Sequence, residues 1–104
     1  MARMIVIYRT PQDRKAFDKH YFEVHIPLAK LLPGLRKYEV STSPIISPVG
    51  WKDAYLVGTL HFDSLDAIKT AFASECGRAC AADRRILAPS EVDVQMYLFD
   101  DREV

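Results

Sequence analysis

The apolar positions of the chain follow a two-residue period in some segments and a helical period in others. Residues 3–9 are apolar on both faces, with Met4 and Val6 on one side and Ile5 and Ile7 on the other. A strand without a polar face is typical of the covered interior of a sheet. We therefore predict a central strand at residues 3–9.

Residues 14–32 change to the helical period. Their apolar side chains recur along one stripe, which comprises Phe17, Tyr21, Val24, Leu28 and Leu31. The helix begins either after Asp13 as its N-cap or after Thr10 with Pro11 in the first turn. Pro27 lacks a backbone donor and clashes with the preceding turn, so we expect a kink there.

The rest of the chain repeats both periods. In order, we predict a strand at 35–42, a long loop at 42–53, a strand at 54–62, a helix that begins after Asp63–Ser64 and continues to Ile86, and a strand at 91–99. Ser74 and Gly77 are expected to interrupt this second helix. The order of elements predicts an α+β ferredoxin-like βαββαβ fold with an antiparallel four-stranded sheet. The 104 residues fit a single domain over residues 1–104.

Two helices cover only one face of such a sheet. The strands at 3–9 and 54–62 are apolar on both faces, and large apolar patches rarely stay exposed. A second copy of the chain, related by a two-fold axis, would cover the other face. We therefore expect a homodimer, and the alternative is a monomer with an unusually apolar sheet face.

Composition narrows the choice of partners. The chain has 14 Lys plus Arg and 14 Asp plus Glu, and its basic residues are not clustered. Nucleic acids and anionic membrane surfaces are therefore poor candidates. No segment approaches the roughly 18 apolar residues of a membrane span, and the N-terminal segment lacks the features of a signal peptide, so we expect a cytoplasmic protein.

The two cysteines, Cys76 and Cys80, are four residues apart in the second predicted helix. They are interpreted as small apolar side chains in a packing face. The alternative is a redox or metal pair, but no nearby histidine completes a set of metal ligands.

Three histidines are candidates for chemistry. On a helical wheel, His25 and His20 lie on opposite shoulders of the apolar stripe, where a cleft between helix and sheet would open. His25 is either a partly buried histidine bonded to a carbonyl group or a general acid/base, and Tyr21 lies one turn before it. His20 is expected to be exposed. His61, in a predicted strand, is either a hydrogen-bonded core residue or part of a pocket wall, and we predict His25, Tyr21 and His61 as catalytic residues.

Amphipathic rings are frequent for so short a chain. Tyr8, Tyr38 and Trp51 suit an aromatic pocket for a small hydrophobic molecule, although they also suit an ordinary core. The sequence has no glycine-rich phosphate loop, CxxC pair, nucleophile elbow or HExxH motif. We therefore predict neither a cofactor nor a metal site.

Residues 16–28, AFDKHYFEVHIPL, resemble the EthD-like family, which is named for a protein required in bacterial ethyl tert-butyl ether degradation. The most specific part of the resemblance is His25-x-Pro27-Leu28, joined at this spacing to Pro33-Gly34-Leu35. The segments at 8–11 and 62–65 are similar too, so the resemblance extends over nearly the whole chain.

This resemblance implies a dimeric α+β barrel with a small-molecule cleft between the sheet and the helices of each subunit. It implies His25 as the functional residue, framed by Pro27 and Leu28. With it we predict Tyr8, Tyr38, Trp51 and Leu28 as substrate-binding residues. The superfamily includes cofactor-free monooxygenases, cyclases, decarboxylases, isomerases and haem-degrading enzymes, so the fold does not fix the reaction.

Three functions remain open from the sequence. The first is an enzyme or accessory protein in the catabolism of a hydrophobic oxygenated compound, with cofactor-free acid/base chemistry such as oxidation, decarboxylation or isomerisation. The second is a non-catalytic ligand carrier or a partner of an oxygenase system. The third is haem binding, for which no axial-ligand motif stands out.

Overall fold

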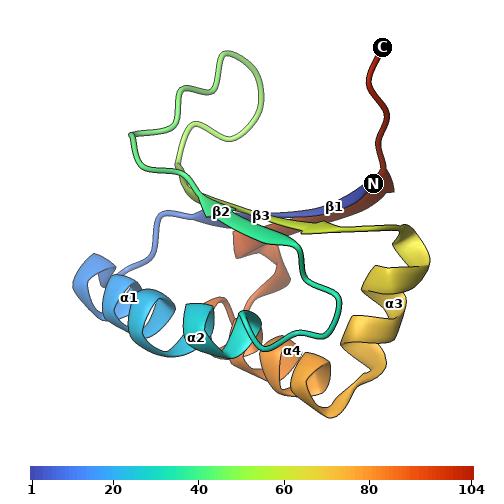
Figure 1. Ribbon diagram of the computed structural model, residues 1–104. Coiled ribbons are helices and arrows are strands. Elements are labelled where there is room, and N and C mark those ends of the chain that lie inside the picture. Colours follow the sequence, from blue (N-terminus) through green and yellow to red (C-terminus); the bar gives the residue numbers. More distant parts are fainter.

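The computed structural model describes residues 1–104, and its four strands form one antiparallel sheet (Figure 1). The strands are β1 (Ala2–Arg9), β2 (Lys37–Val40), β3 (Ala54–Phe62) and β4 (Val94–Asp100). Their order in the sheet is β2-β3-β1-β4, and every neighbouring pair is antiparallel. This is the ferredoxin-like arrangement expected from the sequence, with the two strands that lack a polar face at its centre.

The helices lie together on one face of the sheet (Figure 1). They are α1 (Arg14–His20), the π-helix η1 (Tyr21–His25), α2 (Ile26–Ala29), α3 (Leu65–Ala73), α4 (Glu75–Leu87) and the 3-10 helix η2 (Glu91–Asp93). The predicted last strand was too long at its start, because residues 91–93 form η2. No helix combines the length and the apolar character that crossing a bilayer requires.

Side-chain caps fix where the helices begin. The Asp13 carboxylate accepts a hydrogen bond from the Ala16 backbone N–H at 3.0 Å, so α1 begins as the first of the two alternatives predicted. Ser74 caps α4 by accepting from the Gly77 N–H, which confirms the interruption between α3 and α4. The predicted break at Gly77 is wrong, since this residue lies inside α4. A Cβ on Gly77 would lie 2.2 Å from the Ala71 carbonyl oxygen, so glycine is needed for the close approach of α3 and α4.

The irregularity expected at Pro27 takes the form of a wide turn directly before it. Residues 21–25 form the π-helix η1, and the Ile26 N–H donates to the Tyr21 carbonyl five residues earlier. Pro27 occupies the first turn of α2, where it has no N–H to offer the Glu23 carbonyl. The lost α-helical bond therefore coincides with the widened turn.

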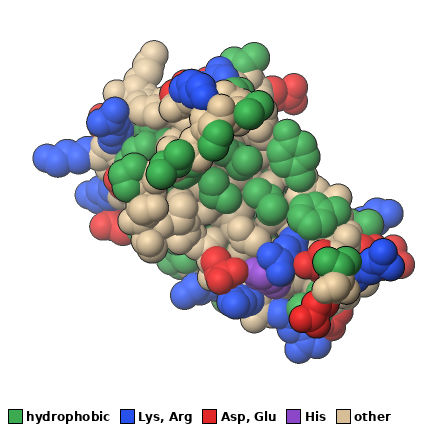
Figure 2. Space-filling model, turned by 90° about the horizontal axis from the view of Figure 1, so that it is seen from above, with side chains coloured by type: hydrophobic (Ala, Val, Ile, Leu, Met, Phe, Trp, Pro, Cys, Tyr) green, Lys and Arg blue, Asp and Glu red, His purple; other side chains and the backbone are tan.

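The two faces of the sheet have different neighbours. Met4, Val6 and Tyr8 of β1 are buried against the helices, together with Leu60 and Phe62 of β3. Ile5, Ile7, Val57, Tyr97 and Phe99 alternate with such residues and therefore point to the other face, over which no helix lies. Figure 2 looks onto this second face and shows its apolar side chains gathered in one patch. We call this surface the open face.

Candidate active site

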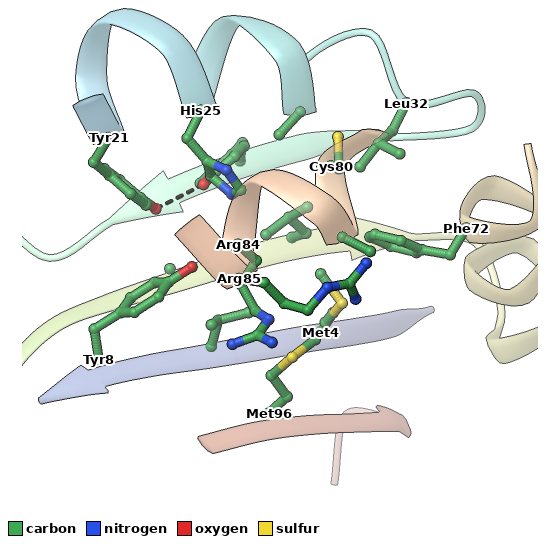
Figure 3. Close-up of a pocket in the computed structure, with 16 residues that line it drawn as sticks. Met4, Tyr8, Tyr21, His25, Leu32, Phe72, Cys80, Arg84, Arg85 and Met96 are labelled. Atoms are coloured by element: carbon green, nitrogen blue, oxygen red, sulfur yellow. Dashed lines mark hydrogen bonds between the residues drawn. The ribbon is translucent and has the colours of Figure 1, made fainter. Parts of the chain in front are cut away.

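A cavity of about 240 Å³ lies between the helices and the covered face of the sheet (Figure 3). Sixteen residues line it, and twelve of these are hydrophobic when the tyrosines are counted among them. The side chains with polar groups are Tyr8, Tyr21, His25, Tyr38, Arg84 and Arg85. Four of the predicted site residues therefore lie around one cavity, although they come from β1, β2 and η1.

His25 is held in one orientation by Asp83 of α4. Its Nδ1 lies 2.8 Å from Asp83 Oδ2, and both side chains are buried. An ionised carboxylate only accepts hydrogen bonds, so Nδ1 is the donor of the pair. In a neutral imidazole the proton on Nδ1 leaves Nε2 as an acceptor. His25 Nε2 has no hydrogen-bond partner in the protein and belongs to a side chain that lines the cavity.

The other oxygen of Asp83 binds the second histidine of this helix. His20 Nε2 lies 2.8 Å from Asp83 Oδ1, and the His20 side chain is 30% exposed. His20 was expected to be exposed, but the structure places it in a His–Asp–His cluster. In a regular helix, residues five apart point in clearly different directions, whereas the i to i+5 bonding of η1 brings them closer to one face. The π turn therefore allows both rings to reach the same carboxylate.

The electrostatic environment keeps His25 neutral and Asp83 ionised. Burial lowers the pKa of His25 below its ordinary value, and the bond to Asp83 offsets only part of this effect. Burial by itself would raise the pKa of Asp83, but the hydrogen bonds from His20 and His25 outweigh it and hold that pKa below its usual range. At neutral pH the pair is therefore a neutral base oriented by a carboxylate.

A second polar group in the cavity consists of two tyrosines. The hydroxyl groups of Tyr21 and Tyr38 are 2.6 Å apart. Gly58 leaves the room for them, because a Cβ at this position would lie 2.9 Å from the Tyr21 hydroxyl. Burial is the main cause that raises the pKa of Tyr21 and of Tyr38, so both rings stay protonated at neutral pH.

Tyr8 brings a third hydroxyl group to the same space. The residue is only 2% exposed, and its hydroxyl has no hydrogen-bond partner in the protein. Figure 3 shows this hydroxyl pointing into the cavity. Burial raises the pKa of Tyr8 well above its ordinary value, so it is a proton donor for a bound group.

Three predicted site residues lie elsewhere. His61 is on the open face, where its Nε2 is 2.7 Å from Glu39 Oε1. Trp51 stacks under the guanidinium of Arg9, whose Cζ is 4.1 Å from the ring centre. Leu28 is partly buried against the core but does not line the cavity. The alternation along β3 explains the position of His61, because His61 and Leu60 point to opposite faces.

Sequence reasoning missed Asp83, Arg84, Arg85 and Gly58. A signal for Asp83 was present, since Cys76, Cys80 and Asp83 have the spacing i, i+4, i+7 of one helix face. A lone carboxylate on a buried stripe requires a partner, and the histidines are the obvious candidates.

The thiol of Cys80 also lies at this cavity, on the buried side of α4. Burial is the largest cause that raises its pKa to about 12, so the thiol is protonated and unreactive at neutral pH. Both cysteines are free in the structure. They pack as small apolar side chains, as the first of the two interpretations expected.

Comparison with known proteins places this chain in a family. The model of the EthD domain matches residues 9–88, which include η1 and the whole of α4. This chain belongs to the EthD family. An uncharacterized 11.0 kDa protein of the thcB-thcC intergenic region of Rhodococcus erythropolis is 32% identical to this EthD protein over 99% of this chain and 96% of its own. The structure of an EthD-family protein from Bacillus halodurans is 29% identical over 98% and 99% of the two chains, with a TM-score of 0.86.

More distant structures share the fold of this EthD protein. A cofactor-independent oxygenase, SnoaB of Streptomyces nogalater, is 16% identical over 99% of this chain and 94% of its own, with a TM-score of 0.67. A hydroxynitrile lyase of Passiflora edulis is 13% identical over 99% and 94%, with a TM-score of 0.74. A dimeric ferredoxin-like protein of unknown function from Thermobifida fusca is 16% identical over 94% and 88%, with a TM-score of 0.66. These likenesses concern the fold, which hosts more than one reaction.

Proposed function

We propose that this EthD protein is a cofactor-free enzyme that moves a proton on a small hydrophobic oxygenated molecule, with His25 as the general base. One observation carries the proposal. The Nδ1 of His25 is committed to Asp83, and its Nε2 is unpartnered at the wall of an apolar cavity. A neutral imidazole in such a position is a base of suitable strength at neutral pH.

The tyrosines supply hydrogen-bond donors for the substrate oxygen, which such a reaction requires in addition to a base. When Nε2 removes a proton from a carbon beside a carbonyl group, the C–H bond breaks, an N–H bond forms and the electron pair moves onto the carbonyl oxygen. Hydroxyl donors in a dry cavity stabilise that oxygen. The Tyr21–Tyr38 pair and the unpartnered Tyr8 are such donors, and their raised pKa values keep their protons in place.

The size of the cavity sets the class of ligand. Its volume of about 240 Å³ is below the roughly 300–1,000 Å³ of sites for drug-sized molecules. Its walls are mainly apolar, so the bound molecule is small and hydrophobic with one or two oxygen functions. The cofactor-independent oxygenase of the same fold supports the idea that this architecture carries out chemistry without a cofactor.

We also propose that the protein is a homodimer in which the open faces of two copies pack together. Ile5, Ile7 and Val57 lie at the centre of this face, and Tyr97 and Phe99 are exposed beside them. A patch of this kind is unusual on a monomer, and an isologous contact buries it on both copies at once. The dimeric ferredoxin-like protein from Thermobifida fusca supports this assembly.

Proton exchange tests the proposed reaction directly. The protein is incubated in D2O with a panel of small aryl and alkyl ketones, among them phenylacetone and 1-indanone, and deuterium at the α-carbon is measured by NMR. We expect exchange above the rate in buffer for at least one ketone, and its loss in the His25→Asn variant. Ligands that bind, as seen by NMR shifts of the cavity tyrosines, but never exchange would contradict catalysis. That outcome favours a carrier that delivers its ligand to an oxygenase partner.

A further inference from the structure

The charge of the cavity indicates what kind of molecule it binds. Arg84 and Arg85 follow one another in α4, and both side chains line the cavity. Neither guanidinium forms a salt bridge with a carboxylate. The one side-chain hydrogen bond of these two arginines runs from Arg84 Nη1 to the Ala88 carbonyl at 3.2 Å. Two cations therefore face the same space without an anionic partner.

No other lining group balances these charges. The cavity wall contains neither aspartate nor glutamate. Asp83, the nearest acid in the sequence, is held by the two histidines, at 2.8 Å from each. The remaining polar groups of the wall, His25 and the tyrosines, are uncharged at neutral pH for the reasons given above. The empty cavity is therefore cationic and attracts an anion.

The cations and the base lie at different depths. Arg85 and Met96 are exposed, Arg84 is half-buried, and Tyr21 and His25 are buried. Figure 3 shows both arginine side chains extending from α4 toward β1 and β4, while Tyr21 and His25 come from the far side. The cavity therefore opens beside α4 and β4, with the guanidinium groups near its mouth and the base at its inner end.

We propose that the ligand is an apolar acid, whose carboxylate binds Arg84 and Arg85 at the mouth and whose apolar body extends inward to His25. This rests on the proposed function, because it assumes that the same cavity holds the substrate. Guanidinium groups match a carboxylate through paired N–H donors, and a charge at the mouth keeps part of its hydration. The apolar walls then contact the rest of the molecule, so the reacting carbon is remote from the carboxylate.

Matched ligand pairs test this inference. Binding of cinnamate and octanoate is compared with that of cinnamamide and octanamide, which have the same shapes without the charge, by isothermal titration calorimetry. We expect each acid to bind roughly tenfold or more tightly than its amide, since bonds to a charged group are stronger than neutral ones. In the double variant Arg84→Gln/Arg85→Gln the acids should bind as weakly as the amides, and amide binding should not change.

Two further variants control for folding and for charge alone. Arg78→Gln removes an arginine from the same helix, outside the cavity, and should leave the preference for acids intact. Arg84→Lys/Arg85→Lys keeps the charge and should restore part of the preference even if the glutamine variant unfolds. Phenyl phosphate is included as a different anion, and tighter binding of it than of cinnamate would overturn the choice of a carboxylate.

The outcomes separate this inference from the proposed function. Equal affinity for acids and amides overturns the inference, while ketone exchange that depends on His25 leaves the proposed reaction intact. A strong preference for acids without any exchange keeps the inference and contradicts the reaction. Failure of both acids and both amides to bind at millimolar concentration overturns the inference as well.

Discussion

Two buried histidines on opposite faces of the sheet each form a hydrogen bond with a carboxylate, but their surroundings are very different. His25 bonds Asp83 at 2.8 Å, and His61 bonds Glu39 at 2.7 Å. Asp83 is 9% exposed and surrounded by helices, whereas the Glu39 side chain is 51% exposed. A histidine–carboxylate pair is thus not in itself a sign of catalysis. The environment of the second nitrogen makes the difference, and only His25 presents it to an apolar cavity.

The largest expected difference between the two histidines is in catalysis. His25→Asn should reduce the exchange rate by roughly 10²–10⁴-fold, the range typical of a lost general base. His61→Asn makes the same change on the open face and should keep most of the activity. Both rates are measured by NMR in D2O, with circular dichroism to verify folding. Equal losses in the two variants would contradict the assignment of His25.

A charge on the open face and a charge on the exposed side of α4 should have different effects on dimer formation. Val57→Glu places a charge at the centre of the open face and should convert the dimer to a monomer, because burying an unpaired carboxylate is costly. Light scattering should then report about 11.8 kDa where the unchanged protein gives about twice that mass. Ile86→Glu introduces the same acid on the exposed side of α4 and should leave the dimer intact. A wild-type mass of one chain at micromolar concentration would disprove the dimer.

The carboxylates of Asp83 and Glu39 should differ in their contribution to stability. Asp83→Asn removes a buried charge that two histidines share, and we expect the free energy of unfolding to fall by about 1–3 kcal/mol. Glu39→Gln alters an exposed partner and should change it by less than about 0.5 kcal/mol. Urea denaturation of both variants provides the measurement. If Glu39→Gln proved the more destabilising of the two, Asp83 would not be the carboxylate that contributes more to stability.

Neighbouring residues of β3 provide a finer comparison, because Gly58 faces the cavity and Thr59 faces away. Gly58→Ala introduces a methyl group 2.9 Å from the Tyr21 hydroxyl, which must move away from Tyr38. We expect a loss of activity of about tenfold, equivalent to one hydrogen bond. Thr59→Ala should have no such effect. If Gly58→Ala retained full activity, the Tyr21–Tyr38 pair would not be needed for the reaction.

The smallest expected effect is the dependence of stability on pH. The pKa of His25 is lower in the folded protein, so the unfolded chain binds more protons and stability falls as the pH drops below about 6.5. The lowered pKa of Asp83 adds a second loss below about pH 4. His25→Asn should remove the first loss and Asp83→Asn the second. Denaturation curves over this pH range measure both losses. A loss that persisted in its variant would contradict its assignment to that residue.

Periodicity was sufficient for the framework of the fold. The strand predicted at 54–62 coincides with β3, and the lack of a polar face correctly identified β1 as central. Asp13 was recognised as a cap because capping is a local property. The strand predicted at 35–42 shortened to residues 37–40, since pairing with β3 decides where an edge strand ends.

The site was less predictable because its key contact is not local. Asp83 lies 58 residues after His25, and no periodic signal joins them. A wheel of 100° per residue separated His20 from His25, because it does not contain the wide turn that brings them together. Which face of a strand packs against the helices also depends on the rest of the fold, so the sequence left open whether His61 lines a pocket, and the structure places it on the open face.

The π turn sets the rotational phase between the two ends of the first helical segment. Each residue of an α-helix advances the chain by about 100° around the axis. The π turn uses five residues where an α turn uses four, so deleting one residue between Tyr21 and His25 would convert it to an α turn and keep α1 and α2 nearly in phase. Phe17 of α1 and Ala29 of α2 would then both stay packed in the core. Inserting one residue would instead rotate α1 relative to α2 by about 100° and turn Phe17 toward solvent, so this segment should tolerate deletions better than insertions.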